Sequence, residues 1–329
     1  MNLRDALSAV AVLGLVLTGA NIATNHLVQT SVPRQRLRAL DESPPTIDVL
    51  AIGNSLVEAD ISPERVEARL RTTHTRARVA NAGLGASGIV EHFLILRHAR
   101  KHLRFRTMVY GFFDHQMAED FVRSNAEIIG NHNLLYYLEP EVALRLLPFG
   151  WWDRLLFAVC RRSALLSERS VMWSKVERMR RSMDELGMPA KSTDAFGRTA
   201  DFTTLEAGSS RAFVLRSEAI LRSGILLAEP VRDLFRTAAE AGARIVVVEM
   251  PMHPSHLRTY YSQPVWREYR ARTREAVLRS GATYLNASDW VSDSNLFADN
   301  LHLTKHGAQF FSDRLGAYLT QIQDSVPTP

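Results

Sequence analysis

The chain has 329 residues, of which 46% are hydrophobic and 23% charged, so it can bury a large core as one elaborated domain or as one domain with an insertion. That composition excludes a chain that is disordered in bulk. The formal net charge is +5 and the pI is near 9.5, but the cations are scattered among 35 acidic residues. Because no zinc-finger, RNP or P-loop pattern occurs either, we expect no nucleic-acid partner.

The first segment is an uncharged run over residues 6–25, which approaches the ~20 residues that a helix needs to cross a bilayer. We predict a signal anchor, or transmembrane segment, over residues 1–26 and a stalk over residues 27–45. A cleaved signal peptide is the close alternative, because Gly19 and Ala20 are small residues. The uncleaved anchor is favoured, since no Ala-x-Ala site is present and the run is longer than a typical signal-peptide core.

The first predicted strand covers residues 47–53, whose β-branched and apolar character is typical of a strand buried on both faces. The next helix is predicted to begin at Ser62 as N-cap, with Pro63 at the first helical position. Ser55 is therefore expected in a connecting loop at the carboxyl edge of the sheet, where open α/β folds place their ligands.

Strands and helices then alternate along the chain. Strands are predicted over residues 77–80, 107–112, 244–250 and 282–286, and helices over residues 89–102, 226–241, 264–280 and after Thr304. This alternation predicts an α/β fold: a three-layer α/β/α sandwich with a mostly parallel, flavodoxin-like sheet, accompanied by the N-terminal anchor helix and a helical insertion. We expect the domain over residues 46–322, its insertion at about residues 114–223, and a short tail over residues 323–329.

Two short motifs carry the chemistry. Ser55 follows Gly53 and Asn54, and Asp299 precedes His302 in an Asp-x-x-His pattern. A serine hydroxyl becomes a nucleophile when a base takes its proton, and an imidazole is a good base when a carboxylate fixes its tautomer. Each motif alone is more often a loop serine or a turn residue. Their combination at the two ends of an alternating β/α chain favours a catalytic triad.

These motifs resemble those of the SGNH (GDSL-like) hydrolases. Gly53-Asn54-Ser55-Leu56 is similar to the family's Gly-Asp-Ser-Leu block, and Asp299-x-x-His302 is similar to its closing block. The segment from Asn81 to Ser87 resembles the second block, so the resemblance implies an oxyanion hole built by the amides of Ser55 and of Gly85 or Ala86. It covers roughly residues 45–113 and 224–322 and is specific at both ends.

One block departs from this pattern. After the third strand the family carries Gly-x-Asn-Asp, whereas this chain has Gly111-Phe112-Phe113-Asp114-His115 and no asparagine at that place. His115 could replace the lost donor, or the backbone amides could suffice. Asp114, His115 and His253 are candidates for substrate binding. The alternative is a cap at the strand end for Asp114 and structural roles for both histidines.

The predicted insertion contains Trp151, Trp152 and Trp173, an arginine-rich helical stretch over residues 168–186 and a polar segment over residues 191–210. We expect it to cap the site. The tryptophans could stack on sugars or lie at a membrane interface, but aromatic residues in an insertion more often form a core. The single cysteine, Cys160, is expected to be a small core residue.

Departures of this kind are familiar in membrane-anchored, envelope-associated relatives that resemble acyltransferases. The resemblance therefore implies a serine esterase or O-acyltransferase that acts on acyl, chiefly acetyl, esters of envelope glycans. It implies a membrane acyl-donor protein as a candidate partner. We expect neither a metal nor an organic cofactor. Arginines at positions 34, 36 and 38 favour a cytoplasmic body, but long domains translocate largely regardless of charge, so we expect an extracytoplasmic domain in the periplasm or at the cell surface. A non-catalytic SGNH-like binding or assembly protein is the alternative.

Overall fold

The computed structural model describes residues 3–27, 32–71, 77–119, 125, 129, 139–169, 172–173 and 207–324. The chain divides into two compact units, Met1–Arg38 with Val122–Pro189 and Ala39–Phe121 with Ala190–Pro329. The second unit contains the sheet. The division therefore separates the β/α framework from a helical unit that includes the N-terminal helix.

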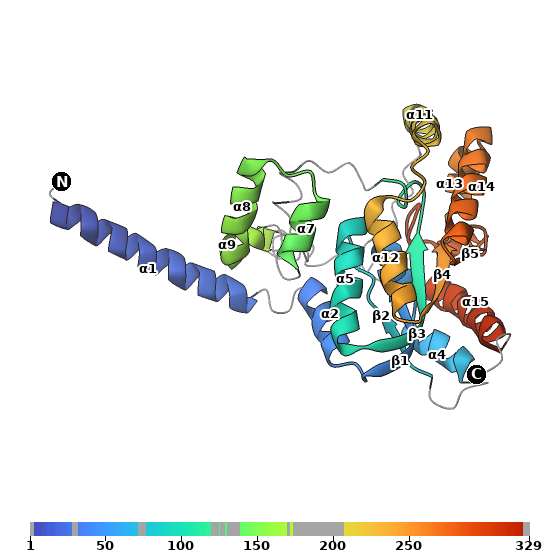
Figure 1. Cartoon of the computed structure of the whole chain (residues 1–329), viewed down its shortest axis with the longest axis horizontal. Helices are drawn as coiled ribbons and strands as arrows, with labels where there is room; N and C mark the ends of the chain where they lie inside the picture. Colours follow the sequence, from blue (N-terminus) through green and yellow to red (C-terminus); the bar gives the residue numbers. More distant parts are fainter. Residues whose placement is uncertain are drawn as a thin grey trace, which may run out of the picture. The chain divides into compact units, whose positions relative to one another are not determined.

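The second unit is built on five parallel strands in the order β2-β1-β3-β4-β5 (Figure 1). They are β1 (Thr46–Ile52), β2 (Val79–Asn81), β3 (Arg104–Phe112), β4 (Arg244–Glu249) and β5 (Thr283–Asn286). In register, Leu50 lies beside Met108 and Val109 beside Val246. All four side chains are buried, as expected for central strands that have helices on both faces. This order is that of flavodoxin-like sheets, and the predicted α/β fold is confirmed.

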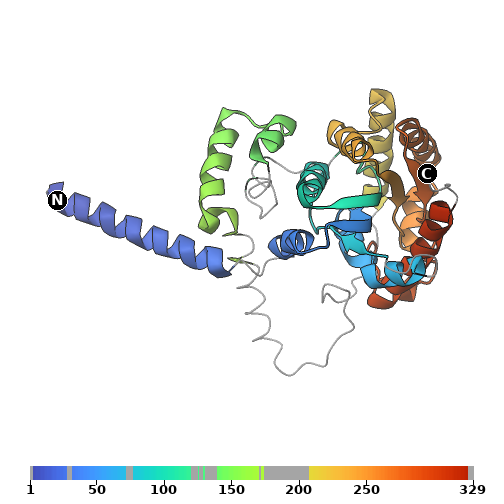
Figure 2. The ribbon, with the colours of Figure 1, turned by 60° about the horizontal axis from the view of Figure 1, so that its bottom comes forward.

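Helices cover both faces of the sheet (Figures 1 and 2). On one face α5 (Ile89–His102) packs against α12 (Glu229–Glu240), and on the other α4 (Pro63–Leu70) packs against α15 (Lys305–Asp324). The predicted caps are present, because Ser62 Oγ accepts a hydrogen bond from Arg65 N at 3.4 Å and Thr304 Oγ1 accepts one from Gly307 N at 3.2 Å.

Two features of this unit, the positions of Ser55 and of the start of β3, differ from the sequence-based prediction. Ser55 does not lie in a loop, since it is the first residue of a short helix, α3 (Ser55–Asp60), whose N-cap is Asn54. Strand β3 begins at Arg104, three residues before the predicted start, because its first residues alternate exposed arginines with buried side chains. Residues in the predicted insertion form α11 (Ala207–Ser223), which packs on α14 (Pro264–Arg279) and on the π-helical turn η3 (Leu257–Tyr261).

The remaining elements of the sheet unit are short and lie near the carboxyl ends of the strands. They are α13 (Pro254–His256) after β4 and the 3₁₀ turn η4 (Ser294–Leu296) after β5. The first follows His253, and the second precedes Asp299 and His302. The loop from η4 to α15 contains the Asp-x-x-His motif, and its first and last parts are joined by an antiparallel bridge between Phe297 and Leu303.

The first unit contains α1 (Leu3–Leu27), α7 (Pro140–Leu146), α8 (Trp151–Arg162) and α9 (Ala164–Ser167), and α2 (Val32–Asp41) leads from it into the sheet unit. Residues 7–27 of α1 have a mean hydropathy of 1.8 and are almost entirely exposed, so α1 is long and apolar enough to cross a membrane. A signal sequence would pass the same criterion. Cys160 is buried as predicted, whereas Trp151 and Trp152, expected in a core, are exposed. The predicted arginine-rich helix lies mostly outside the described residues.

Candidate active site

Ser55 lies at the carboxyl end of β1, held by close packing around the turn. A β-carbon at Gly53 would clash with the side chain of Val57 and would come within 2.6 Å of the carbonyl oxygen of Gly111, so this position requires glycine. Asn54 Oδ1 accepts a hydrogen bond from Leu56 N at 2.9 Å and so caps the first turn of α3. These contacts place the serine hydroxyl at the start of a helix rather than in a flexible connection.

Ser55, His302 and Asp299 form a hydrogen-bonded chain. Ser55 Oγ lies 2.9 Å from His302 Nε2, and His302 Nδ1 lies 2.8 Å from Asp299 Oδ2. Asp299 Oδ1 accepts two further bonds, from the backbone N–H groups of Leu301 and His302, each at 2.7 Å. Burial alone would raise the pKa of Asp299, but the hydrogen bonds from His302 and from the two backbone N–H groups lower it to about 2. The carboxylate is therefore ionised at neutral pH and fixes the imidazole.

The helix that carries Ser55 also holds the loop that carries His302. Asp60, the last residue of α3, is fully buried, and its Oδ1 accepts a hydrogen bond from Leu303 N at 3.0 Å. Its backbone carbonyl accepts a bond from Ser312 Oγ on α15. Ser55 and His302 thus share one rigid support, although 247 residues of sequence separate them. Sequence reasoning did not identify Asp60, because a buried aspartate in a short helix carries no motif.

The segments expected to supply oxyanion donors lie beside α3. Gly85 N donates to Glu58 Oε2 at 2.6 Å, so this amide is engaged by a carboxylate of the same helix as Ser55. Ala86 has a φ of +55°, in the left-handed region that few non-glycine residues adopt. The structure brings Ser55, Gly85 and Ala86 into one region, and their role as donors stays a prediction.

Gln116 contacts Asn54, the residue before Ser55, and sequence reasoning missed Gln116. Asn54 Nδ2 donates to Gln116 Oε1 at 3.0 Å. The orientation of both amides follows from the backbone: Leu56 N fixes the oxygen of Asn54, so its nitrogen faces Gln116 and must meet an oxygen. Gln116 Nε2 therefore points away. It is buried, and no described residue accepts its hydrogen bond.

A cavity of about 400 Å³ adjoins this chain of residues. Gln116 lies on its wall, as do Asn300 and Leu301, the two residues between Asp299 and His302. Aromatic rings of Phe213 and Tyr260 line another part. A cavity of this size and mixed character is typical of a small-molecule site.

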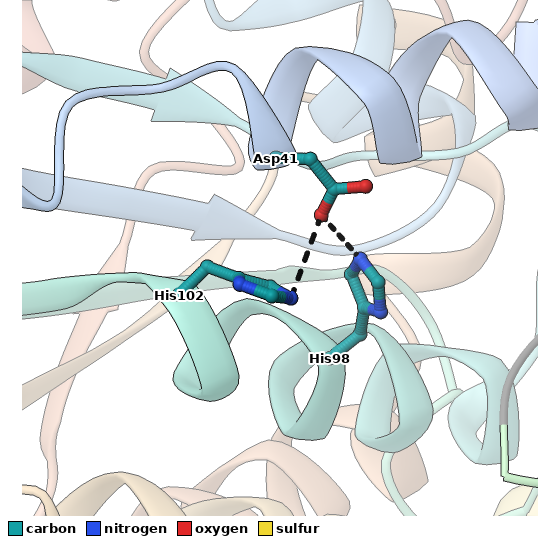
Figure 3. A group of neighbouring side chains, drawn as sticks. All are labelled: Asp41, His98 and His102. Atoms are coloured by element: carbon teal, nitrogen blue, oxygen red, sulfur yellow. Dashed lines mark hydrogen bonds and ion pairs between the residues drawn. The ribbon is translucent and has the colours of Figure 1, made fainter.

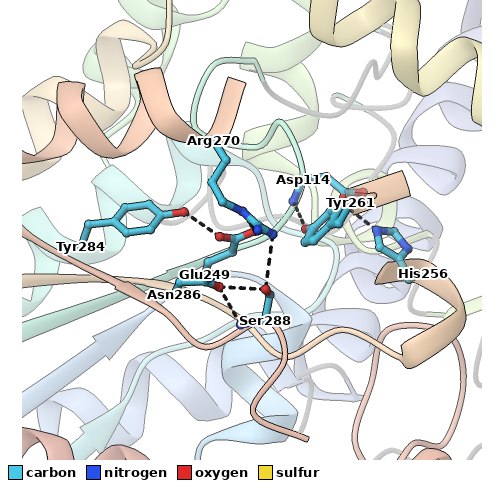
Figure 4. A network of polar contacts seen from close by, with 8 residues as sticks. All are labelled: Asp114, Glu249, His256, Tyr261, Arg270, Tyr284, Asn286 and Ser288. Carbon is cyan, nitrogen blue, oxygen red and sulfur yellow. Dashed lines mark hydrogen bonds and ion pairs between the residues drawn. The ribbon is translucent and has the colours of Figure 1, made fainter. Parts of the chain in front are cut away.

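Asp114 lies on the wall of the cavity, paired with a histidine that the sequence analysis did not single out (Figure 4). Asp114 Oδ1 lies 2.8 Å from His256 Nε2, and Asp114 N donates to Tyr261 Oη at 3.1 Å. Asp114 has a φ of +47°, a strained conformation for a non-glycine residue. His256 is the last residue of α13, seven residues after the end of β4, and the only available signal was its place after the carboxyl end of that strand.

The other two predicted histidines are enclosed by the protein. His115 is 3% exposed, its Nε2 lies 2.7 Å from Ser217 Oγ, and the rings of Phe213 and Trp266 flank it. Burial lowers the pKa of His115 to about 4, so it is neutral at pH 7. His253 accepts a hydrogen bond from Ser255 N on Nδ1 at 3.2 Å, and burial lowers its pKa as well. His115 reaches the cavity wall, and the substrate-binding roles of both stay predictions.

A buried ionic network lies next to the Asp114–His256 pair (Figure 4). Glu249 is fully buried at the end of β4; it accepts hydrogen bonds from Arg270 and, at 2.6 Å, from Tyr284 Oη. Burial raises the pKa of Glu249, and the nearby guanidinium opposes that shift. The guanidinium of Arg270 lies 4.8 Å from the ring centroid of Tyr261. Because Tyr261 holds the backbone of Asp114, the network fixes the position of the Asp114–His256 pair.

No protein-family model and no curated protein matches the chain. Among solved structures it is similar to a lipase/acylhydrolase from Enterococcus faecalis, at 12% identity and a TM-score of 0.37 over 86% of this chain and 99% of that chain. A carbohydrate acetylesterase from Sinorhizobium meliloti is similar at 10% identity and a TM-score of 0.38 over 84% of this chain and 99% of that chain. Likenesses this distant carry no conclusion about the chemistry, which follows from the site's own geometry.

Proposed function

We propose that this chain is an SGNH-like serine esterase or O-acyltransferase that uses Ser55, His302 and Asp299. One observation carries the proposal: the continuous hydrogen-bonded chain from Ser55 Oγ through both ring nitrogens of His302 to Asp299. With Asp299 ionised, Nδ1 carries the proton and the Nε2 lone pair faces the serine hydroxyl. That arrangement prepares Ser55 to attack an acyl carbonyl.

In the proposed reaction His302 Nε2 takes the proton of Ser55 as Oγ bonds to the carbonyl carbon, and the resulting imidazolium is stabilised by Asp299. The alcohol of the ester then leaves with that proton, and the acyl group remains on Ser55. Water or a sugar hydroxyl attacks the acyl-enzyme, with His302 again accepting the proton. Hydrolysis and transfer differ only in which acceptor arrives.

The oxyanion needs donors that face the developing charge. The amides of Ser55, Gly85 and Ala86 are the predicted ones, and Gly85 must exchange its bond with Glu58 for one with the oxyanion. Gln116 is a further candidate, because its Nε2 is a buried donor that no described residue satisfies, on the wall of the adjoining cavity. It would take the place of the asparagine that the resemblance leads one to expect.

The cavity suits the alcohol part of an ester with several hydroxyl groups. Asp114 offers carboxylate oxygens as acceptors at one wall, where His256 Nε2 donates to Oδ1, and aromatic rings at another wall can pack on the C–H face of a sugar. With the apolar helix α1 as a candidate anchor, we propose esters of envelope glycans as the substrate class. An extracytoplasmic site and a membrane acyl-donor protein as partner stay predictions from the sequence.

A fluorophosphonate probe tests the nucleophile, because it labels activated serines covalently. We expect labelling of the wild type, none of Ser55→Ala, and wild-type labelling of the control Ser62→Ala. This control removes an N-cap serine that has no histidine partner among the described residues. Peptide mapping should place the label on Ser55. Folded protein that resists the probe would refute the catalytic proposal.

The bond between Gly85 N and Glu58 specifically favours a second candidate, a non-catalytic SGNH-like binding or assembly protein, because it occupies a predicted oxyanion donor. Glu58→Ala separates the two, because it removes the acceptor of the Gly85 N–H: release of the amide should leave or improve the labelling rate of an enzyme, whereas a binding protein stays unlabelled. For an enzyme, adding a glycan acceptor then distinguishes transfer, in which acyl groups move to the glycan, from hydrolysis, in which they do not.

A further inference from the structure

Three side chains with metal-ligand chemistry converge in the sheet unit (Figure 3). His98 and His102 are four residues apart on α5, so both imidazoles lie on one face of the helix. Asp41 is the last residue of α2. Its Oδ1 lies 2.7 Å from His98 Nε2 and 3.9 Å from His102 Nε2, and the ligand atoms of the three residues all lie within 4.8 Å of one another.

We propose that Asp41, His98 and His102 form a site for a divalent transition-metal ion, with Zn²⁺ as the best match to two imidazoles and one carboxylate. Tetrahedral zinc with bonds of about 2.0–2.2 Å places neighbouring ligand atoms about 3.4 Å apart. The Asp41–His98 distance must open by less than 1 Å, and the Asp41–His102 distance must close by about 0.5 Å, to reach it. The side chains are 46%, 20% and 52% exposed in the order Asp41, His98, His102, so small rotations suffice.

Such an ion would cross-link two helices. Three protein ligands leave one position for water, and the ligands join the C-terminal end of α2 to the middle and end of α5. Because Asp41 lies just before β1, the ion would fix the point at which the chain enters the sheet. A metal that binds the folded state alone stabilises it by mass action.

Metal binding is measured on the full chain in detergent, purified without a polyhistidine tag and stripped with chelator. We expect one Zn²⁺ per chain by titration calorimetry, tetrahedral Co²⁺ absorption bands, and a Zn²⁺-dependent rise in the unfolding temperature. His98→Ala, His102→Ala and Asp41→Asn should each raise the Kd at least roughly tenfold, since loss of even an outer-shell partner costs about 10–100-fold. His306→Ala, which removes another exposed histidine, should not. Absence of binding, or binding unchanged in His98→Ala, overturns the site.

A second observation concerns the exposed face of α8 in the other unit. Its large apolar side chains recur at helical spacing on one side and are exposed: Trp151 by 77%, Trp152 by 54%, Leu155 by 47%, Leu156 by 38% and Val159 by 47%. The opposite side, with Phe157 and Cys160, is buried. Exposed arginines stand beside the apolar stripe at positions 154, 161 and 162. Apolar patches of this kind mark interaction surfaces.

We infer that this face of α8, the stripe from Trp151 to Val159, lies in the headgroup region of the bilayer that α1 crosses. Asn21 of α1 accepts hydrogen bonds from Ser163 Oγ and Leu165 N, directly after α8, at 3.2 and 3.1 Å. Asn21 lies six residues, or about 9 Å, from the end of the candidate span at Leu27. The contact therefore holds α8 at the depth where tryptophan rings concentrate and arginines meet anionic lipid headgroups.

Tryptophan quenching by lipids with brominated acyl chains tests this inference on the full chain in vesicles that contain phosphatidylglycerol. Residues 3–27 contain no tryptophan, so insertion of α1 itself gives no signal. We expect strong quenching of the wild type, its loss in the Trp151→Phe/Trp152→Phe double variant, and its retention in Trp290→Phe. The inference is overturned if the wild type and the double variant are quenched equally, or if aqueous iodide reaches both tryptophans in vesicles. It is also overturned if self-association protects these tryptophans without lipid.

Discussion

Replacing Asp299 by asparagine separates the chemical role of this residue from its structural role. Asp299 Oδ1 accepts two backbone hydrogen bonds, and Oδ2 faces His302 Nδ1. In Asp299→Asn the amide oxygen can keep the backbone bonds, so the NH₂ group faces Nδ1. The imidazole must then carry its proton on Nε2 and point a donor at Ser55 Oγ, which removes the base. A tautomer reversal of this kind costs on the order of 10⁴ in kcat, or about 5 kcal/mol.

The expected loss of stability is smaller. The pKa of Asp299 falls from 3.8 to about 2 on folding, which corresponds to at most roughly 2.5 kcal/mol of unfolding free energy, and to less after allowance for partial exposure. Because the folded-state pKa is depressed, this stabilisation is present above about pH 4 and is lost as the pH falls through 2. The variant should therefore remain folded at pH 7 while losing almost all activity.

The assay compares kcat for p-nitrophenyl acetate and the rate of fluorophosphonate labelling with the free energy of unfolding in urea. Asp293→Asn is the matched control, since Asp293 caps the nearby turn η4 through Asn295 N and contacts no histidine in the described chain. Asp299→Asn activity within tenfold of the wild type would refute the assigned tautomer. An equal loss in Asp293→Asn would show that loop order, and not the carboxylate, controls the rate.

Two further variants test the surroundings of the triad. Burial lowers the pKa of His115 from 6.5 to about 4, so the stability that its neutral ring contributes is complete above pH 6.5 and is lost as the pH falls towards 4. Between pH 7 and 4 the wild type should therefore lose up to about 3 kcal/mol more unfolding free energy than His115→Gln. Parallel pH profiles of the two proteins in urea titrations would contradict this. Gln116→Leu should lower kcat about 10²–10³-fold with little change in KM, because it removes a proposed oxyanion donor; a steady-state experiment that finds only KM changed would exclude that role.

The fold could be predicted because its signals are local. Buried β-branched runs, caps such as Ser62 and alternation with helices are properties of short windows, and they placed every strand of the sheet within a few residues. The triad motifs were visible for the same reason. The parallel sheet brings the segments after its first and last strands to one edge, and the structure there shows Ser55 within hydrogen-bonding distance of His302.

What the sequence did not reveal depends on contacts between distant segments. Helix α3 is six residues long and rests on Asn54 and Asp60, so its hydrophobic periodicity is too short to recognise. The pairing of His256 with Asp114 requires that the turn after β4 meet the turn after β3, and no spacing along the chain encodes that meeting. The same is true of the hydrogen bond that Gly85 N donates to Glu58, which forms only when α3 is helical.

These contacts indicate that two separate sets of residues support the proposed catalytic residues and the cavity wall that would select the substrate. Ser55 and His302 are fixed through Asp60 on the fully buried side of α3, whereas Asp114 and His256 are fixed through Tyr261 and the guanidinium of Arg270. The two supports belong to different elements, so the proposed catalytic residues and the cavity wall can vary separately. Asp114 has a positive φ, and the ionic network next to it holds its backbone through Tyr261. In the proposed function this network keeps the Asp114 carboxylate in place at the cavity wall that would receive the alcohol part of the ester.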